Sequence, residues 1–494
     1  MQKHIYPLMA LSLLVGSPAM ARQTIISGSV HTGVDYWERN YDDDAQENAT
    51  ADDGDKRQIG IGPDIIIVSE SIRDSLSFRY APIIKYDDTN DETDIDHYLS
   101  LAATRMLSQR WAVKVNNDFR LSDDPYFSAE EFADTSSVIT EDMESDSPAS
   151  EGEDASQQES EVSQSDVDEL SKDNGRSRYW TNNLALKTEY IFSERTLLEL
   201  GYAFSVLRNE SSDDDAYDEY DRHAFSANAT YAFNRKWATS LAGMYSRGLF
   251  DDAENPEDGS LISDDLDSYR FLYRLAYEPN AKDSYPFLYD FRTTKYENDY
   301  RRDTLAHNVS MGWNHAFNQR TQMKLGGGPS YAEAEDLDGE WGYNAYFNLS
   351  RTYEHAQLSL SLNKRYDTQN FTGNGDSGLK DTFDAQLRFQ QQLTQALGFN
   401  VYGKYKWESN LDPQDEYLDA VNRNDISDEE STGDVTYDKN TYEMGVGFDY
   451  AFWRYYSVGV KYAYFVSDGD LSSDQYNDHR VMLTLSAAKD LWRW

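Results

Sequence analysis

The amino-acid sequence predicts an all-β fold: a transmembrane, antiparallel, up-and-down β-barrel of about 20 strands, within limits of about 18 and 22. Three observations predict it. Apolar and polar residues alternate along segments of about a dozen residues. Short turns recur about every 40 residues, and acidic residues gather in the long connections between strands. Together they indicate short periplasmic turns at one end of the barrel and long acidic extracellular loops at the other.

The first 21 residues have the pattern of a cleaved export signal. Lys3 and His4 precede the apolar run at 8–16, and the small residues Ala19 and Ala21 occupy the positions that a signal peptidase reads. We expect cleavage after Ala21, so that 22–494 forms the barrel. No later segment offers the roughly 20 consecutive apolar residues of a membrane-spanning helix. Because the first strand starts directly after the signal, we expect no periplasmic plug domain.

The strand pattern is clearest near the C-terminus. In TYEMGVGFDYAF (441–452), Tyr442, Met444 and Val446 share one face and Glu443 lies on the other. Strands of this length that end in aromatic residues match an apolar band between two aromatic girdles. A soluble β-sandwich or propeller is the alternative, but soluble strands are usually shorter, at about 3 to 10 residues.

Short turns are expected between paired strands. They are centred near residues 109, 194, 235, 319, 354, 395 and 454, with a further turn at Pro279–Lys282. The regular spacing indicates one two-stranded unit repeated along the chain.

The charge is strongly negative and unevenly distributed. The net charge is −44, which argues against a nucleic-acid partner. Six connections hold 56 of the 89 acidic residues but only 6 of the 45 basic ones: 42–57, 87–96, 123–177, 209–221, 250–268 and 409–439. We expect this rim to face outward, where divalent cations bound to lipopolysaccharide screen it. The 123–177 segment, rich in Ser, Asp and Glu, is predicted to be a disordered extracellular loop.

Basic residues alternate with apolar ones on many strands and are therefore expected to face the lumen. They are Lys114, Lys187, Arg270, Arg274, Arg292, Lys324, Arg365, Arg388, Lys404, Lys406 and Lys461. A net basic lumen lowers the barrier for anions, and tyrosines such as Tyr402 offer stacking surfaces for sugar rings. The alternative is that these charges only pair across neighbouring strands and fill the barrel.

The C-terminus has features of a barrel-assembly signal. The chain ends on Trp494, with Trp492 two positions before it, and we expect the barrel-assembly machinery as a partner. Asp490 interrupts the alternation of the last strand, and a bulge near Ala488 to Asp490 would restore it.

Several of these segments resemble the β-barrel porin type 2 family of outer-membrane proteins, some of which accompany exopolysaccharide gene clusters. The resemblance rests on the turns FSER (192–195), FNRK (233–236) and FNQR (317–320), and on the segments NDFRLSDDPY (117–126) and RYWTNN (178–183). It covers nearly the whole mature chain and implies an outer-membrane barrel without a catalytic set. The acidic insertion at 123–177 departs from the compact family pattern.

Motifs for catalysis or metal binding are weak. Gly375–Gly378 reads GDSG, as around a protease nucleophile, but has no identifiable partners. Asp336–Glu340 has only part of a calcium loop. His307 and His315 lie too far apart on one expected strand to share a metal. Cysteine is absent, so we expect no enzyme, no cofactor and no specific metal site.

Three function classes remain. The first is an outer-membrane channel for passive passage of small hydrophilic solutes, with anions or saccharides as the narrower expectation. The second is an outer-membrane component of exopolysaccharide export. The third is a closed structural or surface-interaction barrel whose acidic loops bind cations. We favour the first, because the predicted lumen is charged and polar.

Overall fold

The structure is a computed structural model that describes most of the predicted barrel. The described residues are 22–41, 54–124, 170, 172, 175–210, 216–251, 253–254, 261–298, 301–335, 337–373, 378–411, 437–470 and 474–493. The expected export signal, most of the 123–177 insertion and Trp494 lie outside them. Among the described residues, no helix is long and apolar enough to cross a membrane.

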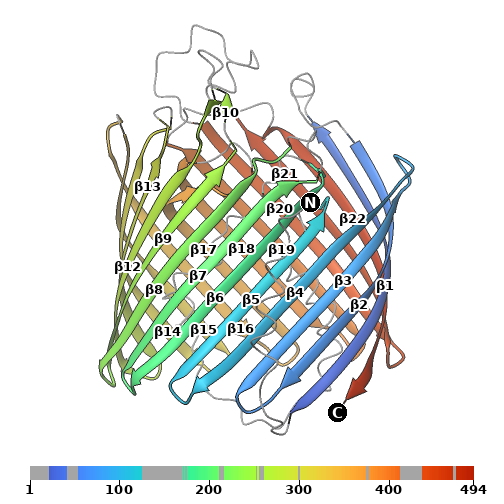
Figure 1. The fold of residues 1–494 in the computed structure, drawn as a ribbon, viewed down its shortest axis with the longest axis horizontal. Helices are drawn as coiled ribbons and strands as arrows, with labels where there is room; N and C mark the ends of the chain where they lie inside the picture. The colour runs from blue at the N-terminus through green and yellow to red at the C-terminus, as the bar shows by residue number, and fades with distance from the viewer. Residues whose placement is uncertain are drawn as a thin grey trace.

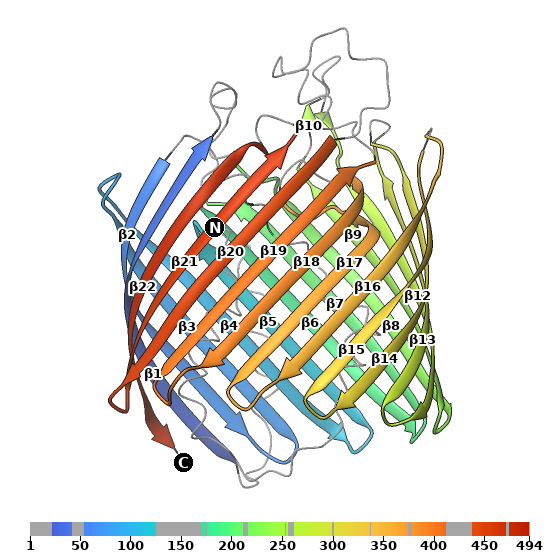
Figure 2. The same ribbon diagram turned by 180° about the vertical axis from the view of Figure 1, so that it is seen from behind.

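Twenty strands form one closed antiparallel sheet (Figures 1 and 2). Each strand pairs with its neighbours along the chain, and β22 pairs with β1 to close the barrel. The predicted fold class and strand number are confirmed. The strands are β1 (Gln23–Tyr41), β2 (Gly54–Glu70), β3 (Asp74–Asp87), β4 (Glu92–Ser108), β5 (Trp111–Ser122), β6 (Tyr179–Ser193), β7 (Thr196–Asn209), β8 (Tyr220–Asn234), β9 (Trp237–Phe250), β12 (Leu266–Asn280), β13 (Asp283–Tyr296), β14 (Thr304–Asn318), β15 (Thr321–Ala334), β16 (Glu340–Thr352), β17 (Ala356–Gln369), β18 (Gly378–Gln392), β19 (Leu397–Asn410), β20 (Tyr437–Phe452), β21 (Tyr456–Gly469) and β22 (Tyr476–Arg493). A separate pair, β10 (Ala253–Glu254) with β11 (Leu261–Ile262), lies in one connection.

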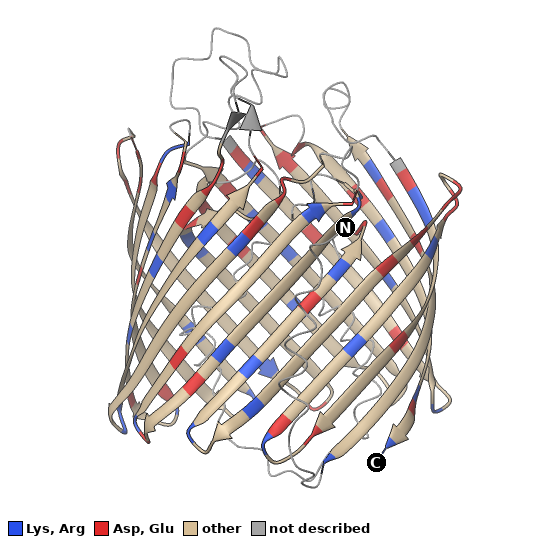
Figure 3. Cartoon of the chain, viewed as in Figure 1, with Lys and Arg blue, Asp and Glu red and all other residues tan. Residues whose placement is uncertain are grey.

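Short and long connections lie at opposite ends of the barrel, as predicted. The short-turn end, drawn at the bottom of Figure 1, carries the connections at 71–73, 109–110, 194–195, 235–236, 281–282, 319–320, 353–355, 393–396 and 453–455. All eight turns named from the sequence are among them. We call the opposite end the long-loop end. Figure 3 shows Asp and Glu at the upper ends of several strands, and Lys or Arg in most of the short turns.

Side-chain alternation gives the barrel an apolar outer face. On β22, Val481, Leu483 and Leu485 are each more than 40% exposed, whereas Arg480, which precedes Val481 and lies on the opposite face, is 8% exposed. Large apolar side chains are stable at such exposure only against lipid or another apolar phase. Closure of the sheet leaves no unpaired strand edge. The barrel is therefore built to span a membrane, with its polar faces turned inward.

Aromatic residues mark the two borders of this apolar face. Near the short turns, Tyr190 packs edge-on against Phe192, and Tyr231 packs edge-on against Phe233. Nearer the long loops, four Tyr–His hydrogen bonds recur between paired strands: Tyr80–His97, Tyr202–His223, Tyr289–His307 and Tyr462–His479. Each tyrosine lies seven residues before the end of its strand. Half of the eight histidines thus belong to one repeated structural pair.

A bulge in the last strand restores the outward position of Trp492. The register with β1 shifts between Ile26, which pairs with Trp492, and Ser27, which pairs with Asp490. Leu491 is the extra residue, one position beyond the predicted bulge. Asp490 faces the lumen and accepts a 2.9 Å hydrogen bond from the Ser27 hydroxyl. Leu491 and Trp492 are then both exposed, at 60% and 64%.

The hairpin formed by β17 and β18 leans into the lumen. Strand β16 stops pairing with β17 at Lys364, whereas β17 and β18 stay paired to Gln369. We call residues 365–373 and 378–382 the hairpin tip. Its Asn370 accepts a 2.9 Å hydrogen bond from the Tyr296 hydroxyl of β13. Its Tyr366 and Leu379 pack on small alanines of the inner wall of β14 and β15.

The described apolar core lies inside the barrel at the long-loop end. Phe371 of the hairpin tip packs against Tyr220 of β8 and Phe250 of β9, with ring centroids 5.2 and 5.7 Å apart. Tyr179, Leu207, Tyr217 and Leu266 complete the buried cluster, and Leu170 packs against it. Gly373 adopts φ +75°, and a Cβ there would lie 2.5 Å from Leu207. Only glycine fits that position, so the inward fold of the tip depends on it.

Candidate functional site

The lumen wall holds the basic residues predicted from the sequence. Strand alternation and the pairing registers place all eleven on the inner face of the barrel. We call them the basic wall; they are Lys114, Lys187, Arg270, Arg274, Arg292, Lys324, Arg365, Arg388, Lys404, Lys406 and Lys461. The structure does not gather them at one point, because they spread over nine strands around the lumen.

Most residues of the basic wall form ion pairs, and in these pairs the cationic side chain is more exposed than its carboxylate partner. The side chain of Arg365 is 48% exposed and that of its partner Asp367 is 8% exposed. Lys404 and Glu443 show the same difference, at 38% and 13%. The pairs Lys114–Glu189, Lys187–Glu199 and Lys406–Glu408 follow it too. The carboxylates are therefore set into the wall, and the cationic groups face the lumen.

One part of the wall links cations and carboxylates in a chain. Asp290 accepts hydrogen bonds from Arg270 at 3.0 Å and from Arg292 at 3.0 Å. Arg292 also pairs with Asp367 of the hairpin tip. Three arginines, counting Arg365, thus share two carboxylates. By contrast, Arg388 and Lys461 have no ion-pair partner among the described residues. The basic wall therefore contains both ion-paired cations and cations without an ion-pair partner among the described residues.

A second group of charges was not anticipated. Where β5 ends and β6 begins, the flanks of the 123–177 insertion fold onto the inner wall. We call Asp35, Asp123, Asp124, Arg176 and Arg480 the anchoring cluster. Arg176 donates to Asp35 at 2.9 Å and to Asp123 at 3.3 Å, and Arg480 donates to Asp124 at 2.6 Å and to Asp35 at 2.9 Å.

Further polar groups complete the anchoring cluster. Lys85 lies 2.8 Å from Asp123 and also pairs with Asp96. Gln58 donates to Asp123 at 2.9 Å and accepts from Arg176 at 3.0 Å. Every charge is thus satisfied by an opposite charge or an amide, which a buried ion requires.

The charges of the two loop flanks are strongly held in their ionised forms. Burial raises the pKa of Asp123, but Arg176 and Lys85 more than offset it and hold that pKa well below its usual range. Burial has the same opposing effect on Asp124, where Arg480 and Arg176 hold the pKa far below the ordinary value. Burial lowers the pKa of Arg176, but Asp123 and Asp35 raise it above its usual value.

A cavity of about 1330 Å³ lies inside the barrel between the short-turn end and the anchoring cluster. Trp453, Tyr455 and Arg493 line its end near the short turns. Asp35, Asp124 and Arg480 line its other end. The anchoring cluster, the apolar core and the hairpin tip together narrow the lumen at the long-loop end.

The sequence pattern missed this inward folding. The segments 117–126 and 178–183 carried the family resemblance, and their described residues include Asp123 and Asp124 beside the cluster residue Arg176. The signal that could have found the cluster is the return of arginines, Arg176 and Arg178, directly after a long acidic run. Among the described residues, no group of three or more His, Asp or Glu side chains is arranged to hold a metal ion.

These features define a membrane-spanning β-barrel with a charged, partly obstructed lumen. No protein-family model matches the chain, and no curated protein matches it. Among solved structures, the chain is similar to OpdQ of Pseudomonas aeruginosa, with 11% identity over 95% of this chain and 98% of that chain and a TM-score of 0.40. It is also similar to OccAB3 of Acinetobacter baumannii, with 9% identity, coverage of 94% and 99%, and a TM-score of 0.41. OccK2 (OpdF) of Pseudomonas aeruginosa, solved in complex with glucuronate, gives 11% identity, coverage of 94% and 97%, and a TM-score of 0.40. Likeness of this degree carries no argument beyond what the barrel itself shows.

Proposed function

We propose that the protein is an outer-membrane channel for passive passage of small hydrophilic solutes, and that it prefers anions. One observation carries the proposal: along the basic wall the cationic groups face the lumen while their carboxylate partners are set into the wall. A lumen that presents cations lowers the electrostatic barrier for anions. Arg388 and Lys461, which have no ion-pair partner among the described residues, add uncompensated positive charge.

The proposed orientation follows the lengths of the connections. The short-turn end faces the periplasm, and the long-loop end faces the cell exterior, as is the rule for bacterial outer-membrane barrels. Lipid contacts the apolar outer face and lipopolysaccharide the rim, where divalent cations screen the acidic loops. Trp492 lies on the outer face beyond the bulge, where the barrel-assembly machinery recognises it together with Trp494. Residues 1–21 serve as the export signal.

The obstructions at the long-loop end determine the size of the solutes that can pass through the channel. The anchoring cluster and the hairpin tip occupy part of the cross-section, so the channel admits small solutes and excludes long polymers. Passage of an exopolysaccharide requires these segments to move out of the lumen.

Reversal potentials in a planar bilayer test the proposal. Under a KCl gradient, the wild-type channel should prefer chloride to potassium. Replacement of Lys404, Lys406 and Lys461 together by Gln should reduce that preference, because it removes three lumen cations. The matched control is Lys364→Gln, since Lys364 lies on the outer face, within 4.4 Å of the Trp407 ring. A reversal potential unchanged by the triple substitution contradicts the role of the basic wall.

A closed barrel is the second candidate, and the inward packing of the hairpin tip favours it. If Phe371 and the anchoring cluster seal the lumen permanently, the protein has no conductance. Folded protein that inserts into bilayers and never conducts supports this candidate over the channel.

A further inference from the structure

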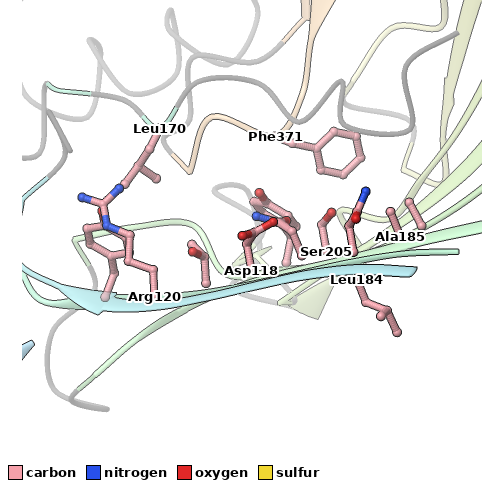
Figure 4. A pocket seen from close by; sticks show the side chains of 13 residues that line it. Asp118, Arg120, Leu170, Leu184, Ala185, Ser205 and Phe371 are labelled. Atoms are coloured by element: carbon pink, nitrogen blue, oxygen red, sulfur yellow. The ribbon is translucent and has the colours of Figure 1, made fainter. Parts of the chain in front are cut away.

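A second cavity, of about 410 Å³, lies against the inner wall of β5, β6, β7 and β8, beneath the apolar core. Figure 4 shows Asp118 and Ser205 rising from the wall strands into it, with Phe371 on the opposite side. Leu170 and Arg120 lie at one end of the cavity, and Leu184 points away from it. The cavity thus has a polar floor of strand residues and an apolar roof of loop and core residues.

The polar floor is unusual in its lack of partners. Four neutral polar side chains line the cavity: Asn116, Thr181, Asn183 and Ser205. None of the four side chains has a hydrogen-bond partner among the described residues, and Ser205 is only 3% exposed. Elsewhere on the wall, polar groups bond to each other, as Ser361 does to Asn348 at 2.7 Å. Of the four, Asn116 is exposed and Thr181 and Asn183 are half-buried. A polar group as buried as Ser205 is normally satisfied by protein, water or ligand.

The two charged residues at the cavity are already engaged. Asp118 accepts hydrogen bonds from Ser100 and Tyr98. Arg120 donates to the backbone oxygen of Asp124, and its guanidinium lies 5.2 Å from the Tyr179 ring. Beside these two charged groups, a solute meets neutral donors and acceptors on one side and apolar surface on the other.

We propose that this cavity is a binding subsite for a neutral saccharide, which deepens the proposed channel function and rests on it. A sugar ring presents hydroxyl groups at its edge and C–H groups on its face. The hydroxyls meet Asn116, Thr181, Asn183 and Ser205, and the C–H face meets the apolar side formed by Leu170, Tyr220 and Phe371. An anionic solute meets the carboxylate of Asp118, whose partners Ser100 and Tyr98 are neutral.

The subsite adjoins the larger cavity. Arg120 lines both cavities, so the two meet at β5. The anchoring cluster adjoins the subsite at β5, because Asp123 and Asp124 directly follow that strand. The same loop flank that narrows the lumen therefore also covers the subsite.

Calorimetric titration of the folded protein in detergent tests the subsite, with sucrose as the neutral probe and glucuronate as the anionic one. Wild-type protein should bind sucrose, and the double variant Asn183→Ala with Ser205→Ala should bind it about tenfold or more weakly, because it loses two hydrogen-bonding side chains. The matched control is Ser359→Ala with Gln386→Ala. Both of these residues lie on the inner face of β17 and β18 and line neither cavity described above.

The outcomes separate the subsite from the channel. Absent sucrose binding, equal sucrose binding by the double variant, or tighter glucuronate binding that the double variant abolishes overturns the subsite. Retention of the barrel is checked by the resistance of each variant to denaturation in detergent without heating. An anion-selective pore that fails to bind sucrose leaves the channel standing. Sucrose binding without any conductance leaves the site standing and overturns the channel.

Discussion

The anchoring cluster and the basic wall use the same residue types in opposite ways. In the anchoring cluster both partners are buried: the side chains of Arg176 and Asp123 are 1% and 3% exposed. On the basic wall Arg365 remains 48% exposed beside Asp367, whose side chain is 8% exposed. The first arrangement holds a chain segment in place. The second holds a cation in position while leaving its charge available to the lumen.

The difference shows that pairing alone does not separate structural from functional charges in a barrel. Removing one partner of a buried pair leaves an uncompensated ion. Removing an exposed cation such as Arg365 removes a charge that water already screens, and Asp367 keeps Arg292 as a partner. Exposure therefore predicts which substitutions destabilise the fold and which alter only the passage of solutes.

The largest loss of stability is expected from the substitution Arg176→Met. The substitution leaves Asp123 buried with Lys85 as its main counter-charge and deprives Asp35 of one of its two arginines. The free energy of unfolding in urea, followed by tryptophan emission, should fall by about 3 kcal/mol. Single-channel conductance should rise, because the flank that carries Arg176 is no longer fixed to the wall.

Arg365→Met is the matched control for that comparison. It removes an exposed cation, and the free energy of unfolding should change by less than about 1 kcal/mol. Equal losses of stability in the two variants would contradict the distinction between the anchoring cluster and the basic wall.

The fold could be predicted because its signal is local. Alternation along each strand, as at Val481, Leu483 and Leu485, depends only on the pleat. Turn position and strand number follow from the repeat. The predicted bulge was misplaced by one residue. The sequence shows that Asp490 breaks the alternation, but it does not show which residue of the last strand is left unpaired with β1.

The candidate site could be predicted only in part, because it depends on contacts between distant segments. The basic wall follows from strand parity. The partners of its members, such as Asp367 for Arg292, require knowing that the hairpin tip leans inward. The segments 117–126 and 178–183 looked specific for architecture alone. In the structure they supply Asp118, Thr181 and Asn183 to the second cavity, a role that no local pattern indicates.

The contribution of the anchoring cluster to stability should depend on pH only at low pH. The pKa values of Asp123 and Asp124 lie below the ordinary value, so their contribution to stability is fully present above that value. It is lost only as the pH falls from the ordinary range through the depressed pKa values. Conductance should therefore stay constant from pH 7 to about pH 5 and rise only below about pH 4. A transition near neutral pH would show that these carboxylates are not held by the arginines.

A smaller effect is expected from Lys172→Met in the same flank. Lys172 donates to Glu443 at 2.9 Å, but Glu443 also accepts from the Tyr402 hydroxyl at 2.9 Å and lies near Lys404. Because these partners remain, the free energy of unfolding should fall by about 1 kcal/mol. The double variant with Tyr402→Phe should lose more than the sum of the single losses, since Lys404 is then the one partner that Glu443 keeps among the described residues. Additive losses would contradict the sharing of Glu443.

The smallest effect on stability, with a clear effect on selectivity, is expected from Arg388→Gln combined with Lys461→Gln. Neither cation has an ion-pair partner among the described residues, so its removal strands no carboxylate and the free energy of unfolding should change by less than about 0.5 kcal/mol. The reversal potential should nevertheless move toward zero, because two uncompensated lumen charges are lost. Arg270→Gln is the informative contrast, since Arg270 is bonded to Asp290 and partly buried. It should cost more stability than the double variant and change the selectivity less. The reverse order would contradict the view that pairing and burial withhold a cation from the solute.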